Sequence, residues 1–190
     1  MLHDSQNQLK AIDNGEALSI KERQIPNKKG YEQSPETAIV TDHARSRSDK
    51  IPASQPLYGS IEMGESNKAV QDFALHEGVG GDGGLPVPGD IFCGAIASCL
   101  DSAIRVVANH LGIQLAKLEV QVEGDVDLRG TLRIDPDVPV WFQHIRVNAC
   151  IIPEDDVPAA TLEAILAAAE YSCVILQTLR NMPDIQITRS

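Results

Sequence analysis

The sequence predicts an α+β protein in which antiparallel strands pack against two long helices. Apolar residues recur at helical spacing over residues 90–111. Apolar and charged residues alternate over residues 115–129, as in a strand with one buried and one solvated face. The strand-like blocks are separated by two helices without a repeating strand–helix–strand order, which argues against a parallel sheet.

Composition excludes several classes of protein. The 190 residues include 16 Lys and Arg against 27 Asp and Glu, a formal net charge of −11. Such an acidic chain lacks the basic surface that nucleic acids or an anionic membrane require. Four cysteines are too few for a disulfide scaffold. No signal peptide is predicted. Asp101 and Arg105 interrupt the most apolar stretch, so we expect no membrane span. We therefore expect a soluble cytoplasmic protein whose thiols are reduced.

The chain divides into an N-terminal extension and one domain. Residues 1–36 show little periodicity and contain two prolines, so we expect an extension that is partly ordered at best, with a short helix around residues 16–23. Residues 37–190 form the predicted domain. It begins with a β-rich segment at 37–41 and a hairpin whose strands, 57–63 and 69–75, flank a turn.

The remaining elements follow in order. Five glycines in residues 78–84, followed by two prolines, predict a loop. The helix over residues 90–111 is apolar on most sides and should be buried on most of them, with Asp90 in its first turn and Gly112 as its C-terminal cap. Further segments are predicted as a strand at 141–152, a helix at 159–171, a helical continuation or a new short helix at 173–180, and a last strand at 185–188.

Common catalytic and binding motifs are missing or out of context. The segment 78–83 (GVGGDG) matches the glycine spacing of a dinucleotide site, but LPVP intervenes before the helix that would bind phosphate. No Gly-Lys-Ser/Thr follows for a P-loop, the histidines and cysteines lack metal-ligand spacing, and no G-x-S-x-G serine is present. The sequence therefore predicts no metal and no nucleotide.

Cysteine chemistry remains. Cys99 lies on an apolar helix face, where a thiol is most often inert core. Cys173 falls where the second long helix ends, and at a helix N-terminus the dipole would favour its thiolate, although core packing is the simpler interpretation. We expect structural roles for Cys93 and Cys150.

Taken in order, several segments resemble the OsmC/Ohr superfamily, and its OsmC-like branch in particular. The glycine–proline loop at 80–88 (GGDGGLPVP) and the cysteine helix at 95–99 (AIASC) are similar to that family's first motif. DLRG at 127–130 and a second cysteine motif at 168–173 (AAEYSC), followed by Thr178 and Leu179, continue the resemblance over about residues 37–190.

The resemblance implies an intertwined homodimer of α+β subunits, with antiparallel sheets around a long central cysteine-bearing helix. It also implies a peroxidase that needs no metal, haem or flavin and reduces organic hydroperoxides, and in some members hydrogen peroxide, in oxidative or osmotic stress. By resemblance Cys99 is the peroxidatic cysteine and Cys173 the resolving one, and an external dithiol reduces their disulfide. The alternative is a dimeric binding protein that holds a small lipid-like ligand in an apolar interface pocket.

Two positions depart from the family pattern. Gly89 stands where the family has a glutamate that holds a thiolate-stabilising arginine, and neighbouring Asp90 is the candidate replacement. Arg45 and Arg47 are the candidate arginines. Val174 stands at the position of the family's proline, and without a proline the second helix is free to continue through Cys173.

Overall fold

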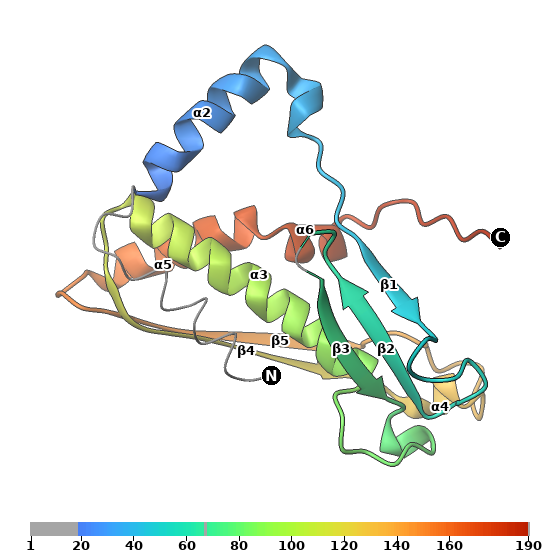
Figure 1. Ribbon diagram of the computed structural model, residues 1–190. Helices are drawn as coiled ribbons and strands as arrows, with labels where there is room; N and C mark the ends of the chain where they lie inside the picture. The colour runs from blue at the N-terminus through green and yellow to red at the C-terminus, as the bar shows by residue number, and fades with distance from the viewer. Residues whose placement is uncertain (1–18, 67, 190) are drawn as a thin grey trace.

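The computed structural model describes residues 19–66 and 68–189, and within them it shows an α+β arrangement (Figure 1). One sheet has three antiparallel strands in the order β1 (Ala44–Arg47), β2 (Tyr58–Met63) and β3 (Ala69–Ala74). The other pairs β4 (Leu115–Asp125) with β5 (His144–Pro153), also antiparallel. The long helices are α3 (Pro88–His110) and α5 (Ala159–Ser172), and α6 (Val174–Arg180) follows α5.

Helix α3 confirms the long helix that periodicity predicted. Pro88 occupies its first turn, where a missing N–H costs nothing. Gly112 follows its C-terminus with φ of 70°, a left-handed conformation that glycine adopts without strain. Within one chain, however, only one stripe of α3 is buried, so the expectation of burial on most sides is wrong for the single subunit. The stripe repeats every fourth residue and comprises Ile96, Leu100, Ile104 and Ala108.

The core lies between this stripe and α5. Leu100, Ile104 and Ala108 contact Ile165, Ala169 and Cys173, all almost without solvent exposure. Inward residues of β4 and β5, with Ile175 and Leu176 of α6, close the cluster. The alternation in the sequence therefore did identify the buried face of β4, on which Leu118 and Val120 contact the core.

Several predicted boundaries are wrong. Strand β4 ends at Asp125 because Asp127 accepts a hydrogen bond from the Arg129 N–H (3.0 Å) and starts the short helix α4 (Leu128–Thr131). Strand β5 starts at His144 rather than residue 141. The predicted strand at 37–41 is replaced by a 3₁₀ turn, η1 (Pro35–Ala38), and an irregular segment, and the first strand is β1. Another 3₁₀ turn, η2 (Glu77–Val79), lies in the glycine loop.

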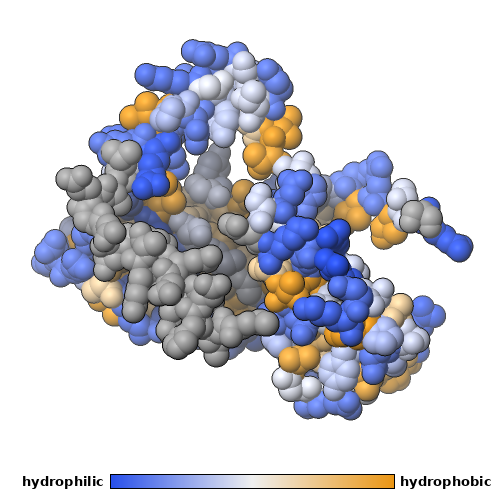
Figure 2. All heavy atoms as spheres, in the orientation of Figure 1, coloured by the Kyte–Doolittle hydropathy of each residue, from blue (hydrophilic) through white to orange (hydrophobic). Residues whose placement is uncertain are grey.

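The C-terminal segment is not a strand in this chain. Residues 182–189 extend away from the rest of the molecule, where Met182, Ile185 and Ile187 are 75–91% exposed (Figures 1 and 2). Alternating polarity alone predicted a strand here, but a strand also needs a partner edge, and this segment pairs with none among the described residues.

Helix α2 (Ile20–Gln33) belongs to the predicted extension and is longer than expected; residues 16–18 of the predicted helix lie outside the described part. Ser19 begins α2 by accepting from the Glu22 N–H, while the Glu22 carboxylate accepts from the Ser19 N–H. The Ile20 N–H, the first of α2, donates to Asn109 Oδ1 at the end of α3 (3.0 Å). From this contact α2 projects away from α3 (Figure 1). The boundary between extension and domain stays a prediction.

By length and composition alone, α3 could cross a membrane, and so could the bent pair of α5 and α6. The buried helix of a soluble domain has the same composition. Asp101 and Arg105, the two charges that interrupt the apolar stretch, form an ion pair one turn apart on α3 (2.6 Å).

Candidate functional site

Cys99 and Cys173 come together in the structure although they are far apart in the sequence. Cys99 lies in the middle of α3 and packs against the core cluster that contains Cys173. The Cys99 thiol lies close enough to Cys173 to influence the pKa of the Cys173 thiol, and both thiols are free. The structural roles expected for Cys93 and Cys150 stay a prediction.

Cys173 lies at a break between two helices. Helix α5 ends at Ser172 and α6 begins at Val174, at an angle of 67° to α5. Cys173 takes the extended conformation at this corner, with φ −77° and ψ 100°. The expectation that the helix could run on through Val174 is therefore wrong. A proline is not needed, because the corner directs the apolar residues of α6 onto the same core as α5.

The two thiols differ in exposure and acidity. Cys173 is fully buried, and this burial, helped by the neighbouring Cys99 thiol, raises its pKa above the usual value. Backbone hydrogen bonds from the first turn of α6 act in the opposite direction but do not prevail. The N-terminus of α6 thus favours the Cys173 thiolate as expected, but desolvation is the larger effect and the pKa is raised.

Cys99 borders an open groove of about 480 Å³ along α3, beside the core stripe. The groove is lined by small, apolar and hydroxyl side chains: Ser98, Cys99, Ser102, Ala103, Val106, Val107 and Ser172. It therefore admits a small molecule to one thiol of the pair while the other remains behind it. No charged side chain of the described residues lines this groove.

Arg45 and Arg47 do not reach Cys99 within the described chain. Both extend from β1 to Glu62 on β2, a carboxylate that is only 8% exposed. Arg45 donates to Glu62 Oε1 from Nε (3.1 Å) and Nη2 (2.7 Å), and Arg47 donates to Oε2 from Nη1 (2.8 Å). The pair of guanidinium groups lowers the pKa of Glu62 to about 2.

Asp90 is not placed near the thiols either. Its carboxylate accepts a hydrogen bond from the Val87 N–H (2.9 Å) and so caps the first turn of α3. One turn later, Cys93 has a raised pKa, first because it is partly buried and second because of the Asp90 charge. Asp90 is thus a helix cap in this chain rather than a group that stabilises the Cys99 thiolate.

Sequence reasoning missed Glu62, which holds both candidate arginines in one ion-pair cluster. The sequence offered no clear signal, because Ser60 and Glu62 alternate with apolar residues as on a solvated strand face, yet both are buried. A buried carboxylate in a strand requires a cationic partner on a neighbouring strand. In the observed register Arg45 lies directly opposite Glu62.

A family model described as OsmC-like protein matches residues 81–188, more than half of the chain. The chain belongs to the OsmC-like family. The match includes both cysteines of the pair, and the resemblance found in the sequence is thereby confirmed. No curated protein shows a significant match to the chain.

Solved structures from this family share the fold. An organic hydroperoxide resistance protein OsmC from Legionella pneumophila is 23% identical, with a TM-score of 0.56 over 75% of this chain and 90% of its own. An organic hydroperoxide resistance protein from Elizabethkingia anophelis is 16% identical, with a TM-score of 0.56 over 76% and 91%. An OsmC-like protein from Mycoplasma pneumoniae is 11% identical, with a TM-score of 0.57 over 75% and 89%.

The described residues contain no cluster of side chains that could bind a metal ion. Within residues 19–66 and 68–189, no three His, Cys, Asp or Glu side chains lie close enough to hold a metal ion. What the site offers is two interacting thiols, one beside an open groove and one buried, which suits thiol–disulfide chemistry.

Proposed function

We propose that this protein is a thiol-dependent peroxidase that reduces organic hydroperoxides, with Cys99 as the peroxidatic and Cys173 as the resolving cysteine. The observation that carries the proposal is the proximity of a groove-lining thiol on α3 to a buried thiol at the corner between α5 and α6. Membership of the OsmC-like family supports it, because two of the similar structures are organic hydroperoxide resistance proteins.

In the proposed reaction, the Cys99 thiolate attacks one peroxide oxygen. The O–O bond breaks, an S–O bond forms, and the leaving alkoxide takes up a proton to become an alcohol. The sulfur is then a sulfenic acid. The Cys173 sulfur attacks it, so that an S–S bond forms and the oxygen leaves as water. An external dithiol reduces this disulfide by exchange and is itself oxidised by two electrons.

The exposures of the two thiols fit these roles. Peroxide enters the groove beside Cys99, and the groove's apolar lining suits an alkyl hydroperoxide. Cys173 is shielded from solvent and its raised pKa keeps it protonated at neutral pH, so it does not compete for peroxide. When Cys99 becomes a sulfenic acid, Cys173 is the adjacent thiol.

We further propose an intertwined homodimer that works in the cytoplasm, where a dithiol reductant is available. Apolar surface supports the dimer: the exposed tail residues Met182, Ile185 and Ile187, and the half-exposed face of α3, are unusual on a lone subunit. Sedimentation should find a dimer at micromolar concentration, and a monomer would contradict this part of the proposal.

The central test follows consumption of cumene hydroperoxide in the presence of dithiothreitol. We expect activity in the wild type and its loss in Cys99→Ser. Cys150→Ser is the matched control, since Cys150 lies on β5 opposite Glu119, and it should keep the wild-type rate. Equal rates in wild type and Cys99→Ser, or no consumption in either, would refute the peroxidase and favour a non-catalytic binding protein for a lipid-like ligand.

A further inference from the structure

The groove of the proposed peroxide site is lined by three serines, and only one of them has a free hydroxyl hydrogen. A serine hydroxyl has a single hydrogen to donate. Ser98 Oγ donates to the Ala95 carbonyl oxygen (3.0 Å). Ser172 Oγ donates to the Ala168 carbonyl oxygen (2.9 Å). The Ser102 hydroxyl donates to none of the described residues, so its hydrogen is available to a molecule in the groove.

Helix geometry places this free hydroxyl beside Cys99. Ser102 follows Cys99 by three residues on α3, and residues at that spacing are neighbours on a helix surface, with Cβ atoms about 5–6 Å apart. Helical side chains also lean toward the N-terminus, so the Ser102 side chain leans over the turn that contains Cys99. Both side chains line the same groove. A molecule that reaches the Cys99 sulfur through this groove therefore also meets the Ser102 hydroxyl.

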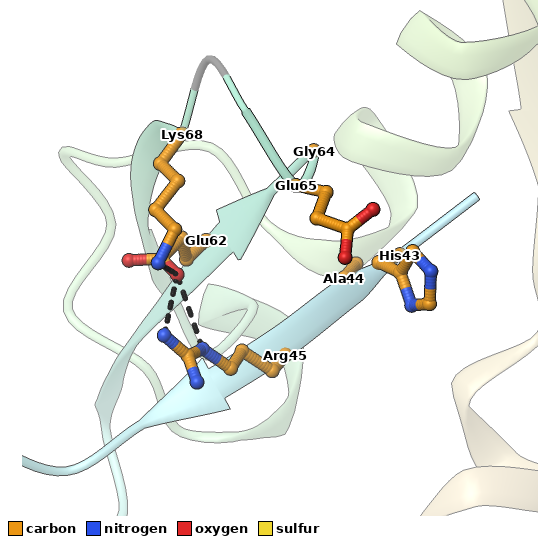
Figure 3. Close-up of a pocket in the computed structure, with 7 residues that line it drawn as sticks. All are labelled: His43, Ala44, Arg45, Glu62, Gly64, Glu65 and Lys68. Carbon is orange, nitrogen blue, oxygen red and sulfur yellow. Dashed lines mark hydrogen bonds and ion pairs between the residues drawn. The ribbon is translucent and has the colours of Figure 1, made fainter. Parts of the chain in front are cut away.

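Charged donors lie elsewhere in the described chain. Asp101 and Arg105, which are close to Cys99 in the sequence, pair with each other and do not line the groove. Arg45 and Lys68 are held by Glu62 in a separate pocket on the three-stranded sheet (Figure 3). Within residues 19–66 and 68–189, a peroxide in the groove thus meets no cationic side chain, and a hydroxyl is the polar group that faces it.

The proposed reaction develops negative charge on one oxygen. The Cys99 thiolate gives an electron pair to the terminal peroxide oxygen, an S–O bond forms and the O–O bond breaks. The other oxygen leaves as an alkoxide and takes a proton from water, so that Cys99 is oxidised by two electrons and the peroxide is reduced. A hydrogen-bond donor beside the leaving oxygen accelerates such a step, because its hydrogen bond strengthens as the charge develops.

We propose that Ser102 is a catalytic residue whose hydroxyl donates a hydrogen bond to the leaving oxygen of the hydroperoxide. This inference rests on the proposed peroxidase function. Ser102 keeps its own proton throughout, because water protonates the alkoxide. An alkoxide is a poor leaving group and depends on this donor. A peracid does not, because its leaving group is a stable carboxylate.

The test compares these two kinds of oxidant in single-turnover reactions. Reduced full-length protein is mixed with cumene hydroperoxide or peracetic acid and quenched with N-ethylmaleimide, and the remaining Cys99 thiol is quantified by mass spectrometry. Ser102→Ala should slow oxidation by cumene hydroperoxide about tenfold, as expected for one lost hydrogen bond to a charged oxygen. Oxidation by peracetic acid should change less than about twofold. Equal slowing with both oxidants, or none with either, would overturn the proposal.

Two further variants separate the hydroxyl from the shape of the groove. Ser102→Thr keeps a hydroxyl at this position and should restore part of the rate with cumene hydroperoxide. Ser98→Ala removes a hydroxyl that is already bonded to a backbone carbonyl, so its effect should be much smaller than that of Ser102→Ala. Circular dichroism and sedimentation verify that each variant folds and associates as the wild type does. A loss in Ser98→Ala equal to that in Ser102→Ala would contradict the assignment.

Alkylation of Cys99 by iodoacetamide distinguishes the leaving oxygen from the thiolate as the group that Ser102 serves. Alkylation requires the Cys99 thiolate but breaks no O–O bond. Its pH profile should therefore be the same in Ser102→Ala and in the wild type. A profile shifted to higher pH would mean that the Ser102 hydroxyl stabilises the thiolate instead, and the proposed role would be wrong.

These measurements also separate the inference from the peroxidase proposal. Single-turnover oxidation of Cys99 needs neither a reductant nor repeated cycles. If the wild type consumes no hydroperoxide with dithiothreitol but Ser102→Ala still slows oxidation by cumene hydroperoxide alone, the peroxidase proposal fails and the role of Ser102 stands. If turnover is normal and Ser102→Ala matches the wild type, only the role of Ser102 is refuted.

Discussion

The helical core and the three-stranded sheet of this OsmC-like chain differ in the side chains that they gather. The helical core brings two thiols together in apolar surroundings, with no charged side chain lining the groove beside Cys99 among the described residues. The sheet gathers three cations around one carboxylate, and its strands contain no cysteine. A core that excludes charge favours a protonated thiol, whereas the cations of the sheet keep its almost buried carboxylate ionised.

Replacing the buried thiol of Cys173 should change the products of peroxide oxidation completely, which is the largest effect expected. In Cys173→Ser, peroxide should convert Cys99 to a sulfenic acid that dimedone traps, and no Cys99–Cys173 disulfide should form because the resolving sulfur is gone. Peptide mapping after peroxide treatment measures both products. Cys150→Ser should form the disulfide as the wild type does, and a disulfide from Cys99 to any other cysteine in the wild type would contradict the pairing.

Truncating the core should lower stability without touching the charge cluster. Ile104 is fully buried between α3 and α5, so Ile104→Ala should reduce the free energy of unfolding by about 2–5 kcal/mol through lost contacts and a cavity. Urea unfolding at fixed protein concentration measures this loss of unfolding free energy. Ile152→Ala is the control, since Ile152 is 45% exposed, and an equal loss there would mean that the core assignment is wrong.

The charge cluster should make stability sensitive to acid. Because folding lowers the pKa of Glu62 from 4.5 to about 2, its stabilising contribution is present above pH 4.5 and is lost as the pH falls toward 2. Unfolding free energies measured across that window should fall less steeply in Glu62→Gln than in the wild type. If the unfolding free energies of wild type and Glu62→Gln fell equally with pH, Glu62 would not govern this acid sensitivity.

Removing the Asp90 cap of α3 should have the smallest effect on stability. Asp90→Ala loses the carboxylate that accepts from the Val87 N–H and should cost about 0.5–1 kcal/mol of unfolding free energy. Because Asp90 lies away from the Cys99 groove, the pH profile of Cys99 alkylation should not change. A shifted profile would mean that the Asp90 carboxylate influences the Cys99 thiolate after all.

Local patterns predicted much of the fold and part of the site. The 3.6-residue period identified α3, and alternation identified the hairpin and the buried face of β4, since these patterns depend on which side of one element faces the core. The family resemblance singled out Cys99 and Cys173. The same local patterns failed at 185–188, where alternation is present but no edge among the described residues pairs with the segment.

By itself, the sequence determined the two long helices, the antiparallel strands and the two cysteines of interest. Only the tertiary structure decided that the chain turns by 67° at Cys173 without a proline, and that Glu62 rather than Asp90 holds the arginines. The reason is physical. Periodicity reports the environment of one element, whereas a helix corner and an ion pair depend on where distant elements meet, and hence on register and packing.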